Sequence, residues 1–196
     1  MNREELLDLF RRCSALLEGH FRLSSGLHSS GYLQCALVLQ HPKHAEALGA
    51  ALAERLRDLR PSTILSPALG GLIIGHEVAR ALGARAIFAE REDGALRLRR
   101  GFALTEAERV VVVEDVVTTG GSTRETIQVA AAAGAQVLAA SAVVDRSGGK
   151  AALDVPLHAL VQLSLPTYDP DACPLCAQGL PIAKPGSRQI AVPHDQ

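Results

Sequence analysis

Apolar residues recur along the chain in two spacings, one typical of helices and one typical of buried strands. Near the N-terminus, helical spacing joins the apolar residues Leu6, Leu7, Phe10, Cys13, Leu16 and Leu17. We therefore predict an amphipathic helix over residues 3–17 that ends at Gly19. Polar, glycine-broken sequence follows from His20 to Gly31.

Beyond residue 33, apolar strands and amphipathic helices are expected to alternate. Helices are predicted at residues 42–60, where Pro42 begins and Pro61 ends the pattern, and at 72–82 and 122–133. Buried strands are predicted at residues 63–65, 86–88, 110–113, 137–144 and 157–165. This repetition predicts an α/β fold with a mainly parallel central sheet flanked by helices. The charged stretch between Phe88 and Val110 is typical of an exposed loop or hairpin.

Length and composition fit one domain. The chain has 196 residues, of which 47% are hydrophobic and only 3% aromatic, so the core is expected to consist of Ala, Leu and Val. We expect a single domain over residues 1–196. It would comprise an N-terminal helix and small hood (1–40), a core sheet (61–166) and a Pro-rich peripheral tail (167–196).

Charge and cysteine content exclude several classes of partner. A net charge of −1 provides no general attraction for nucleic acid or an anionic membrane. Four cysteines do not form a disulfide framework, and no 18-residue apolar run or signal-like N-terminus is present. We therefore expect no nucleic-acid or membrane partner and a reducing, cytoplasmic setting.

The strongest chemical signal is the stretch VVVVEDVVTTGGSTRE at residues 110–125. Glu114 and Asp115 follow a buried strand, so we expect both at the carboxyl edge of the sheet, where ligands of α/β folds bind, and neither in the core. Backbone N–H groups and hydroxyls at the start of the next helix form a phosphate nest at Thr118, Thr119, Gly120, Gly121 and Ser122.

The acidic pair would repel that phosphate, so it must serve another part of the ligand. Carboxylates accept hydrogen bonds from vicinal hydroxyls, which indicates a ribose 5-phosphate derivative held at both ends. The alternative is an ordinary strand–turn–helix connection with Ser122 or Thr118 as a simple N-cap.

This stretch resembles the binding loop of the type I phosphoribosyltransferases: an apolar strand, two acidic residues, two apolar residues, then Thr, a small residue and Gly. The resemblance implies the fold of that family with an N-terminal hood. It also implies binding of 5-phosphoribosyl 1-pyrophosphate (PRPP) by Glu114, Asp115, Val116, Val117 and the loop 118–122.

Three further stretches are similar to the orotate phosphoribosyltransferases of that family. The hood motif has its counterparts here in Phe21, Ser25, Gly26, Ser29 and Tyr32. In the family, the residue matching Arg146 binds the orotate carboxylate and that matching Thr118 contacts the base. Gly70 and Gly71 stand at the pyrophosphate loop, where glycine permits positive φ and close approach to an anion. Taken alone, these could be a Ser/Gly loop, a surface Asp–Arg pair and a tight turn.

The resemblance, from Leu16 to about Pro166, implies an enzyme of pyrimidine (UMP) biosynthesis. It would transfer the phosphoribosyl group from PRPP to orotate, giving orotidine 5′-monophosphate and pyrophosphate. The family is homodimeric and uses Mg²⁺ carried by PRPP, so no protein side chain is expected as a direct metal ligand. A purine or xanthine phosphoribosyltransferase, or a catalytically silent nucleotide-sensing regulator, remain as alternatives.

The catalytic loop departs from the family pattern. Arg91 matches the leading arginine of the loop, but Glu92 stands where lysine is usual, and no Lys or His occurs between His76 and Lys150. We hypothesise that the leaving group is stabilised electrostatically by one or more of Arg97, Arg99 and Arg100, the alternative being solvated hairpin charges.

Two smaller features complete the sequence picture. In the hood, Ser24 replaces a commonly basic residue and His28 stands where another is usual. Cys173 and Cys176 have the spacing of half a zinc site, but no second Cys pair or His-x₃-His motif accompanies them. We therefore expect a peripheral turn there.

Overall fold

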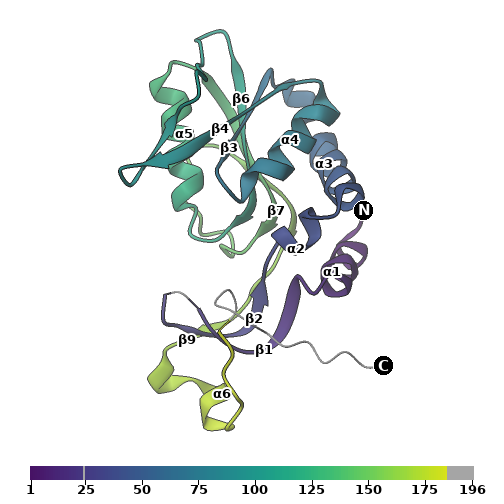
Figure 1. Cartoon of the computed structure of the whole chain (residues 1–196), viewed down its shortest axis with the longest axis vertical. Coiled ribbons are helices and arrows are strands. Elements are labelled where there is room, and N and C mark those ends of the chain that lie inside the picture. Colours follow the sequence, from purple (N-terminus) through teal and green to yellow (C-terminus); the bar gives the residue numbers. More distant parts are fainter. Residues whose placement is uncertain (24, 185–196) are drawn as a thin grey trace.

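The computed structural model describes residues 1–23 and 25–184. Within them, two separate sheets follow one another along the long axis of the molecule (Figure 1). The larger sheet has the strand order β5-β4-β3-β6-β7-β8. Its strands are β3 (Thr63–Pro67), β4 (Arg85–Glu92), β5 (Ala95–Leu98), β6 (Arg109–Val117), β7 (Gln136–Asp145) and β8 (Leu157–Gln162). All neighbouring pairs are parallel except β4 and β5, which form an antiparallel hairpin. The predicted mainly parallel sheet is confirmed.

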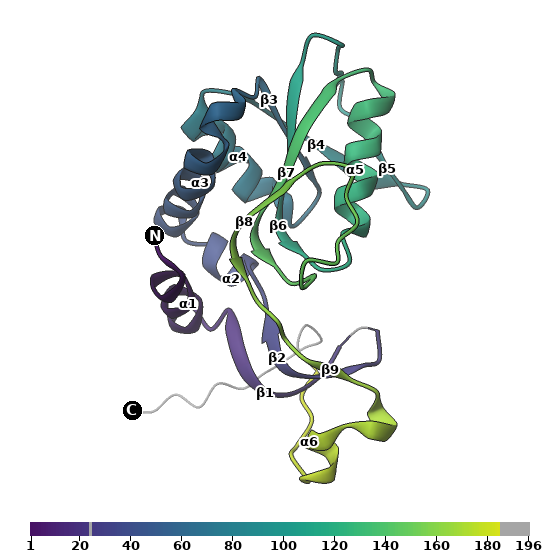
Figure 2. The same cartoon turned by 180° about the vertical axis from the view of Figure 1, so that it is seen from behind.

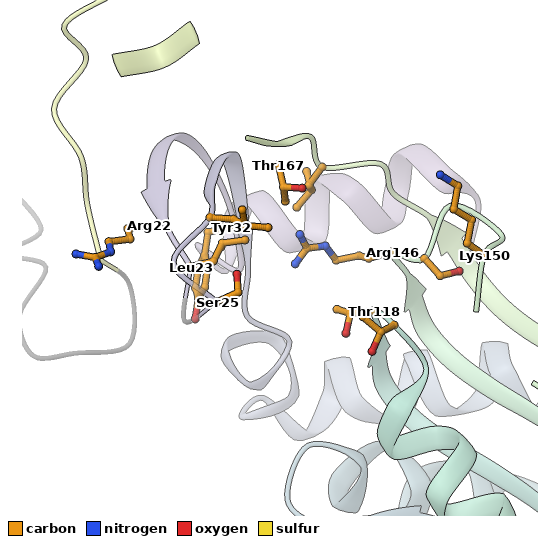
Figure 3. A pocket seen from close by; sticks show the side chains of 12 residues that line it. Arg22, Leu23, Ser25, Tyr32, Thr118, Arg146, Lys150 and Thr167 are labelled. Atoms are coloured by element: carbon orange, nitrogen blue, oxygen red, sulfur yellow. The ribbon is translucent and has the colours of Figure 1, made fainter. Parts of the chain in front are cut away.

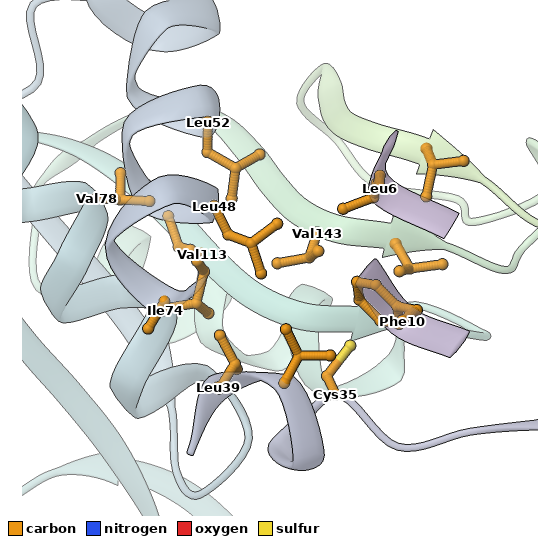
Figure 4. Close-up of a cluster of buried hydrophobic side chains, with 14 of the residues drawn as sticks. Leu6, Phe10, Cys35, Leu39, Leu48, Leu52, Ile74, Val78, Val113 and Val143 are labelled. Atoms are coloured by element: carbon orange, nitrogen blue, oxygen red, sulfur yellow. The ribbon is translucent and has the colours of Figure 1, made fainter. Parts of the chain in front are cut away.

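Helices cover both faces of this sheet. The helices α3 (Pro42–Leu56) and α4 (Gly71–Leu82) pack on one face, and α5 (Gly121–Ala132) packs on the other (Figures 1 and 2). Alternation along β6 explains this, since Val111 and Val113 join the cluster beneath α3 and α4 while Val110 and Val112 face α5. Figure 4 shows the first cluster, in which Leu and Val predominate and Ala contributes, as the composition predicts, together with Ile64, Ile74, Phe10 and Cys35.

The N-terminal segment differs from the prediction. The helix α1 (Arg3–Arg12) begins with a capping box between Asn2 and Glu5 and stops before Ser14, whose φ is +52°. Leu16 and Leu17, which were predicted to lie in the helix, instead begin the strand β1 (Leu16–Arg22). The predicted helix over 3–17 is therefore five residues too long.

The hood is a second, three-stranded antiparallel sheet. Its order is β1-β2-β9, with β2 (His28–Leu33) in the centre and β9 (Thr167–Tyr168) supplied by the C-terminal part of the chain. The short helix α2 (Ala36–Leu39) leads from β2 back to the main body, and the short helix α6 (Pro174–Ala177) lies beyond β9 (Figure 2).

The segment after Pro166 was predicted as a weakly patterned, peripheral tail. Residues 167–184 in fact complete the hood, because β9 pairs with β2 and Phe21 forms a bridge with Ala183. Cys173 is only 4% exposed. Residues 185–196 of the tail lie outside the described part of the chain.

The predicted strands and helices from residue 42 onward are confirmed. The strands and helices from residue 42 to 162 occur where expected, with small shifts at their ends, and the charged stretch after Phe88 is the β4–β5 hairpin. All four cysteines are free. Among the described residues, no helix combines the length and apolar character needed to cross a bilayer.

Candidate active site

The predicted phosphate loop joins β6 to α5 at the carboxyl edge of the main sheet. Gly120 caps α5 with a φ of +77°, which strongly favours glycine, and a Cβ atom there would also be crowded at 3.2 Å from Cβ of Ala151. In residues 1–23 and 25–184, the backbone N–H groups of Thr118, Thr119 and Gly120 donate to no other group of the chain. Together with the first turn of α5, they are available to an anion.

The acidic pair lies inside β6 rather than beyond its end, because the strand extends four residues past the predicted Val113. Glu114 is 9% exposed and belongs to the buried polar residues, so the expectation that neither carboxylate is in the core is wrong for Glu114. Burial is tolerated because the carboxylate accepts hydrogen bonds from Oγ of Ser122 (2.9 Å) and Oγ1 of Thr123 (2.6 Å). These contacts tie β6 to the first turn of α5.

Burial also sets the ionisation of the pair. The pKa of Glu114 is raised, mainly by burial and further by the neighbouring Asp115 charge, against the lowering effect of the two hydroxyls. The pKa of Asp115 is raised by burial, against the backbone N–H of Val116, which donates to Oδ1 at 2.8 Å. Both groups would gain from a ligand that donates hydrogen bonds or brings positive charge.

Gly70 and Gly71 were predicted to supply positive φ, and this is wrong for both. Gly70 has φ −55° and lies at the N-terminus of α4, and Gly71 is the first residue of that helix. Close approach, the second predicted reason, does hold. A Cβ atom on Gly70 would lie 2.6 Å from Oδ1 of Asp115, and one on Gly71 would lie 2.8 Å from the carbonyl oxygen of Val113.

A cavity of about 790 Å³ separates the phosphate loop from the hood (Figure 3). It brings together Thr118, Thr119, Arg146, Ser25 and Tyr32 from the predicted site. The remaining residues of its wall are Arg22, Leu23, Leu27, Ser147, Lys150, Leu165 and Thr167. Parts of the chain far apart in sequence therefore meet here.

Arg146 follows β7 directly and extends into this cavity (Figure 3). In the described part of the chain, its guanidinium has no ion-pair partner, and its buried Nε atom has no hydrogen bond. Burial lowers the pKa of Arg146 from its ordinary value. The neighbouring Asp145 is 2% exposed and accepts from Ser147 and Gln162 instead, which excludes the simple Asp–Arg surface pair.

The hood residues of the motif have divided roles. Ser25 and Tyr32 line the cavity. Gly26, with a φ of +88°, lies in the turn between β1 and β2. Ser29 is buried, and its hydroxyl lies 2.9 Å from the carbonyl oxygens of both Gly31 and Pro166, to either of which its single proton can be donated. Phe21 packs against Tyr32. Ser24 lies outside the described residues.

The arginines of the β4–β5 hairpin are not part of the cavity wall. Arg91 forms an ion pair with Glu125 of α5 (3.0 Å), and Arg99 forms one with Glu92 (3.1 Å). Arg97 is 3.8 Å from Glu92, and Arg100 pairs with Glu90 at 2.9 Å. Within this chain, the four cations are held by acids of the hairpin and of α5.

Sequence reasoning missed two cations that line the cavity, Arg22 and Lys150. Arg22 directly follows the hood residue Phe21, and Lys150 ends the turn that begins with Arg146. Their proximity to the motifs was the available signal.

Comparison with known proteins agrees with this geometry. A family model described as phosphoribosyl transferase domain matches residues 36–158. The orotate phosphoribosyltransferase of Desulforamulus reducens is 54% identical over 190 residues, covering 97% of this chain and 100% of the relative. That of Heliobacterium modesticaldum is 53% identical over 190 residues, covering 96% of this chain and 100% of the relative. The solved orotate phosphoribosyltransferase of Aeropyrum pernix superposes with a TM-score of 0.68 at 28% identity, covering 81% of this chain and 93% of that structure.

The fold and site therefore define a phosphoribosyltransferase of type I architecture. Within that class, the chain belongs to the orotate phosphoribosyltransferase family.

Proposed function

We propose that this chain transfers the phosphoribosyl group of PRPP to orotate, giving orotidine 5′-monophosphate and pyrophosphate in pyrimidine biosynthesis. In the reaction, a nitrogen of orotate forms a bond to the anomeric carbon and loses its proton, while the bond to pyrophosphate breaks and the leaving group takes the electron pair. The proposal rests on the family, on the phosphate loop with its acidic pair, and above all on Arg146.

Arg146 is the observation that carries the choice of base. A half-buried guanidinium without an anionic partner is costly, and its planar fork matches a carboxylate in two parallel hydrogen bonds. Orotate carries a carboxylate, whereas adenine, xanthine and uracil do not. Thr118 and Tyr32 line the same cavity and are assigned to the base ring and its edge.

PRPP is assigned to the phosphate-loop side, where Thr118 and Thr119 line the cavity and the other predicted PRPP-binding residues lie outside its wall. The loop 118–122 would hold the 5′-phosphate through its N–H groups, and Glu114 and Asp115 would accept from the ribose hydroxyls. Glu114 has capacity for this, because a carboxylate offers about four acceptor positions and its present donors are two hydroxyls. Gly70 and Gly71 would leave room for the pyrophosphate beside Asp115.

Stabilisation of the leaving pyrophosphate is assigned to the hairpin arginines together with Arg91. Each is ion-paired with a glutamate and solvent-accessible, so an exchange of that glutamate for pyrophosphate would cost little. None of them can donate a proton at neutral pH, so their contribution is electrostatic.

The acidic pair also fits the Mg²⁺ dependence that the family implies. Mg²⁺ prefers oxygen ligands and is usually held by substrate phosphates with one or two carboxylates nearby. Asp115 suits this environment, since Oδ2 accepts no hydrogen bond within the described residues and burial raises its pKa. When bound with PRPP, Mg²⁺ would neutralise charge on the pyrophosphate.

A homodimer and a cytoplasmic setting are part of the same proposal. The dimer is supported by the resemblance and by exposed apolar side chains beside the pyrophosphate loop, Leu69 at 82% and Ile73 at 47% exposure. By the same resemblance, the β4–β5 hairpin of one chain would act at the cavity of the other. Light scattering of the purified chain would give its oligomeric state.

The test is the loss of orotate absorbance in the presence of PRPP and Mg²⁺, with adenine, xanthine and uracil as alternative bases. Turnover with orotate alone is expected. Turnover with a purine instead would favour the other phosphoribosyltransferases, and binding of PRPP without turnover of any base would favour a regulator.

A further inference from the structure

Four metal-ligating side chains converge at the far side of the hood. They are His20 of β1, His28 of β2, Cys173 just before α6 and Cys176 within it, and their ligand atoms all lie within 4.8 Å of one another. It is the one such cluster of His, Cys and acidic residues found in residues 1–23 and 25–184. The two histidines and Cys173 are buried, while Cys176 is exposed.

The spacing of the ligand atoms matches a tetrahedral metal site. With bonds of about 2.0–2.1 Å to nitrogen and 2.3 Å to sulfur, the edges of a tetrahedral zinc site measure about 3.3–3.8 Å. Nε2 of His20 lies 3.0 Å from Nδ1 of His28, 3.6 Å from Sγ of Cys173 and 3.8 Å from Sγ of Cys176. Sγ of Cys176 lies 3.3 Å from Nδ1 of His28. These four edges lie close to the ideal lengths, and the other two, from Sγ of Cys173, lie within 4.8 Å, so a local contraction around Cys173 would place one ion at the centre.

The protonation of His20 suits a ligand. Its Nδ1 atom lies 2.9 Å from the carbonyl oxygen of Leu180, which can only accept, so Nδ1 carries the proton and Nε2 directs its lone pair into the cluster. An outer hydrogen bond of this kind orients metal-binding histidines in general. The carbonyl comes from the residues directly after α6, so the same segment supplies two ligands and fixes a third.

Without a metal, the contact between the two histidines can be explained but the position of the two thiols cannot. Nδ1–H of His28 could donate to Nε2 of His20, and that hydrogen bond would satisfy both atoms without any cysteine. Two thiols nevertheless lie at the same point, from a segment more than 140 residues away. Two thiolates and two neutral imidazoles around a divalent ion carry no net charge, which makes burial inexpensive.

We propose that His20, His28, Cys173 and Cys176 bind one Zn²⁺ in a closed structural site that fastens the C-terminal segment to the hood. Mixed sulfur and nitrogen ligands in a tetrahedron select zinc among the common divalent ions, and four protein ligands leave no open position for catalysis. Binding releases the two thiol protons. The site is distinct from the Mg²⁺ that PRPP would carry.

The zinc site would also position the wall of the active-site cavity. Arg22 lies two residues after His20, Leu27 directly precedes His28, and both line the cavity with Thr167 of β9. The ion would hold the two ends of the hairpin turn and the strand beside it in one arrangement. Its loss is therefore expected to affect the orotate side of the cavity more than the phosphate loop.

The first test is the zinc content of the full chain after reconstitution with Zn²⁺ and gel filtration. The wild type is expected to hold about one Zn²⁺ per chain, and Cys176→Ala is expected to hold less than about a tenth of that. Cys176 is exposed, so its truncation should not prevent folding. Cys13→Ala, which removes a cysteine outside the cluster, should retain the metal. Zinc-free wild type, or equal zinc in Cys176→Ala, would overturn the proposal.

Co²⁺ gives a second readout that does not depend on activity. Cobalt in place of zinc should produce the visible bands of a tetrahedral ion and thiolate-to-metal charge transfer, and Cys176→His should bind with altered bands because it keeps four ligands. An octahedral cobalt spectrum in the wild type would contradict the site.

Kinetics would then separate the structural role from the proposed reaction. Removing zinc with a chelator should raise KM for orotate at least threefold more than KM for PRPP and should lower the melting temperature of the wild type but not of Cys176→Ala. Because metal content and spectra are measured without substrate, failure of the zinc proposal and failure of the proposed function are distinguishable.

Discussion

Truncation of Arg146 tests the assignment of the base subsite. Arg146→Ala removes the guanidinium that extends into the cavity from the end of β7. In the described chain this guanidinium has no ion-pair partner. Hydrogen bonds to charged groups contribute about 1.5–3 kcal/mol, and the half-buried position of Arg146 places the loss at about 2–3 kcal/mol. At about 1.4 kcal/mol per factor of ten, this corresponds to a rise of about 30- to 150-fold in KM for orotate.

The assay is steady-state turnover with each substrate varied in turn. KM for PRPP should change less than about threefold, because the phosphate loop and the acidic pair are untouched. Arg146→Lys should fall between wild type and Arg146→Ala, since lysine keeps the charge and loses the planar fork. Arg12→Ala, an exposed arginine at the end of α1, serves as the control. Equal losses for orotate and PRPP would refute the assigned role.

Three further predictions concern the other parts of the site. Gly70→Ala requires no change of backbone conformation but places Cβ against Asp115, so kcat/KM for PRPP should fall about 10- to 100-fold, whereas Arg12→Ala at the exposed end of α1 should leave it near wild type; an unchanged value for Gly70→Ala would show that Asp115 can move freely. Because burial raises the pKa of Glu114 above its ordinary value of 4.5, the folded state binds more protons than the unfolded state just above that pH, and the stability of the wild type relative to Glu114→Gln should decline from pH 4.5 to 7. Urea unfolding at both pH values measures this, and a relative stability that rises with pH would contradict the burial argument. If the hairpin stabilises the leaving group, Arg99→Ala should lower kcat and leave KM for orotate nearly unchanged. An unchanged rate of the chemical step in pre-steady-state kinetics would remove the hairpin from the mechanism.

The core of the fold could be predicted because its signals are local. The strands β3 and β6 are short apolar runs followed by a helical pattern, and β4, β7 and β8 contain apolar runs of strand length, so the type of these elements follows from periodicity. Leu16 and Leu17 show where this fails. Their spacing fits a helix, yet Ser14 ends α1, and the two residues pair with Leu33 and Tyr32 across the hood. That tertiary pairing overrides the local pattern.

The motifs of the candidate site could be predicted from the sequence, but the residues with which the hood completes the cavity wall could not. The acidic pair and the loop 118–122 lie at the end of β6, and Arg146 follows the neighbouring parallel strand β7, so the sheet places them at one edge. The roles of Arg22, Lys150 and Thr167 depend on how the hood folds over that edge, which no local spacing records. The proposed zinc site was the hardest part to predict. Cys173 and Cys176 provide only two of its four ligands, and the two histidines lie on a hairpin that is distant in sequence.

Competition among bases tests the central claim most directly. Equimolar orotate, uracil, adenine and xanthine are incubated with PRPP, Mg²⁺ and the purified chain, and the nucleotides and pyrophosphate are quantified together. The account predicts orotidine 5′-monophosphate as the one nucleotide formed, with one pyrophosphate for each orotate consumed. Formation of a purine nucleotide, or no nucleotide from a chain that binds PRPP, would contradict it.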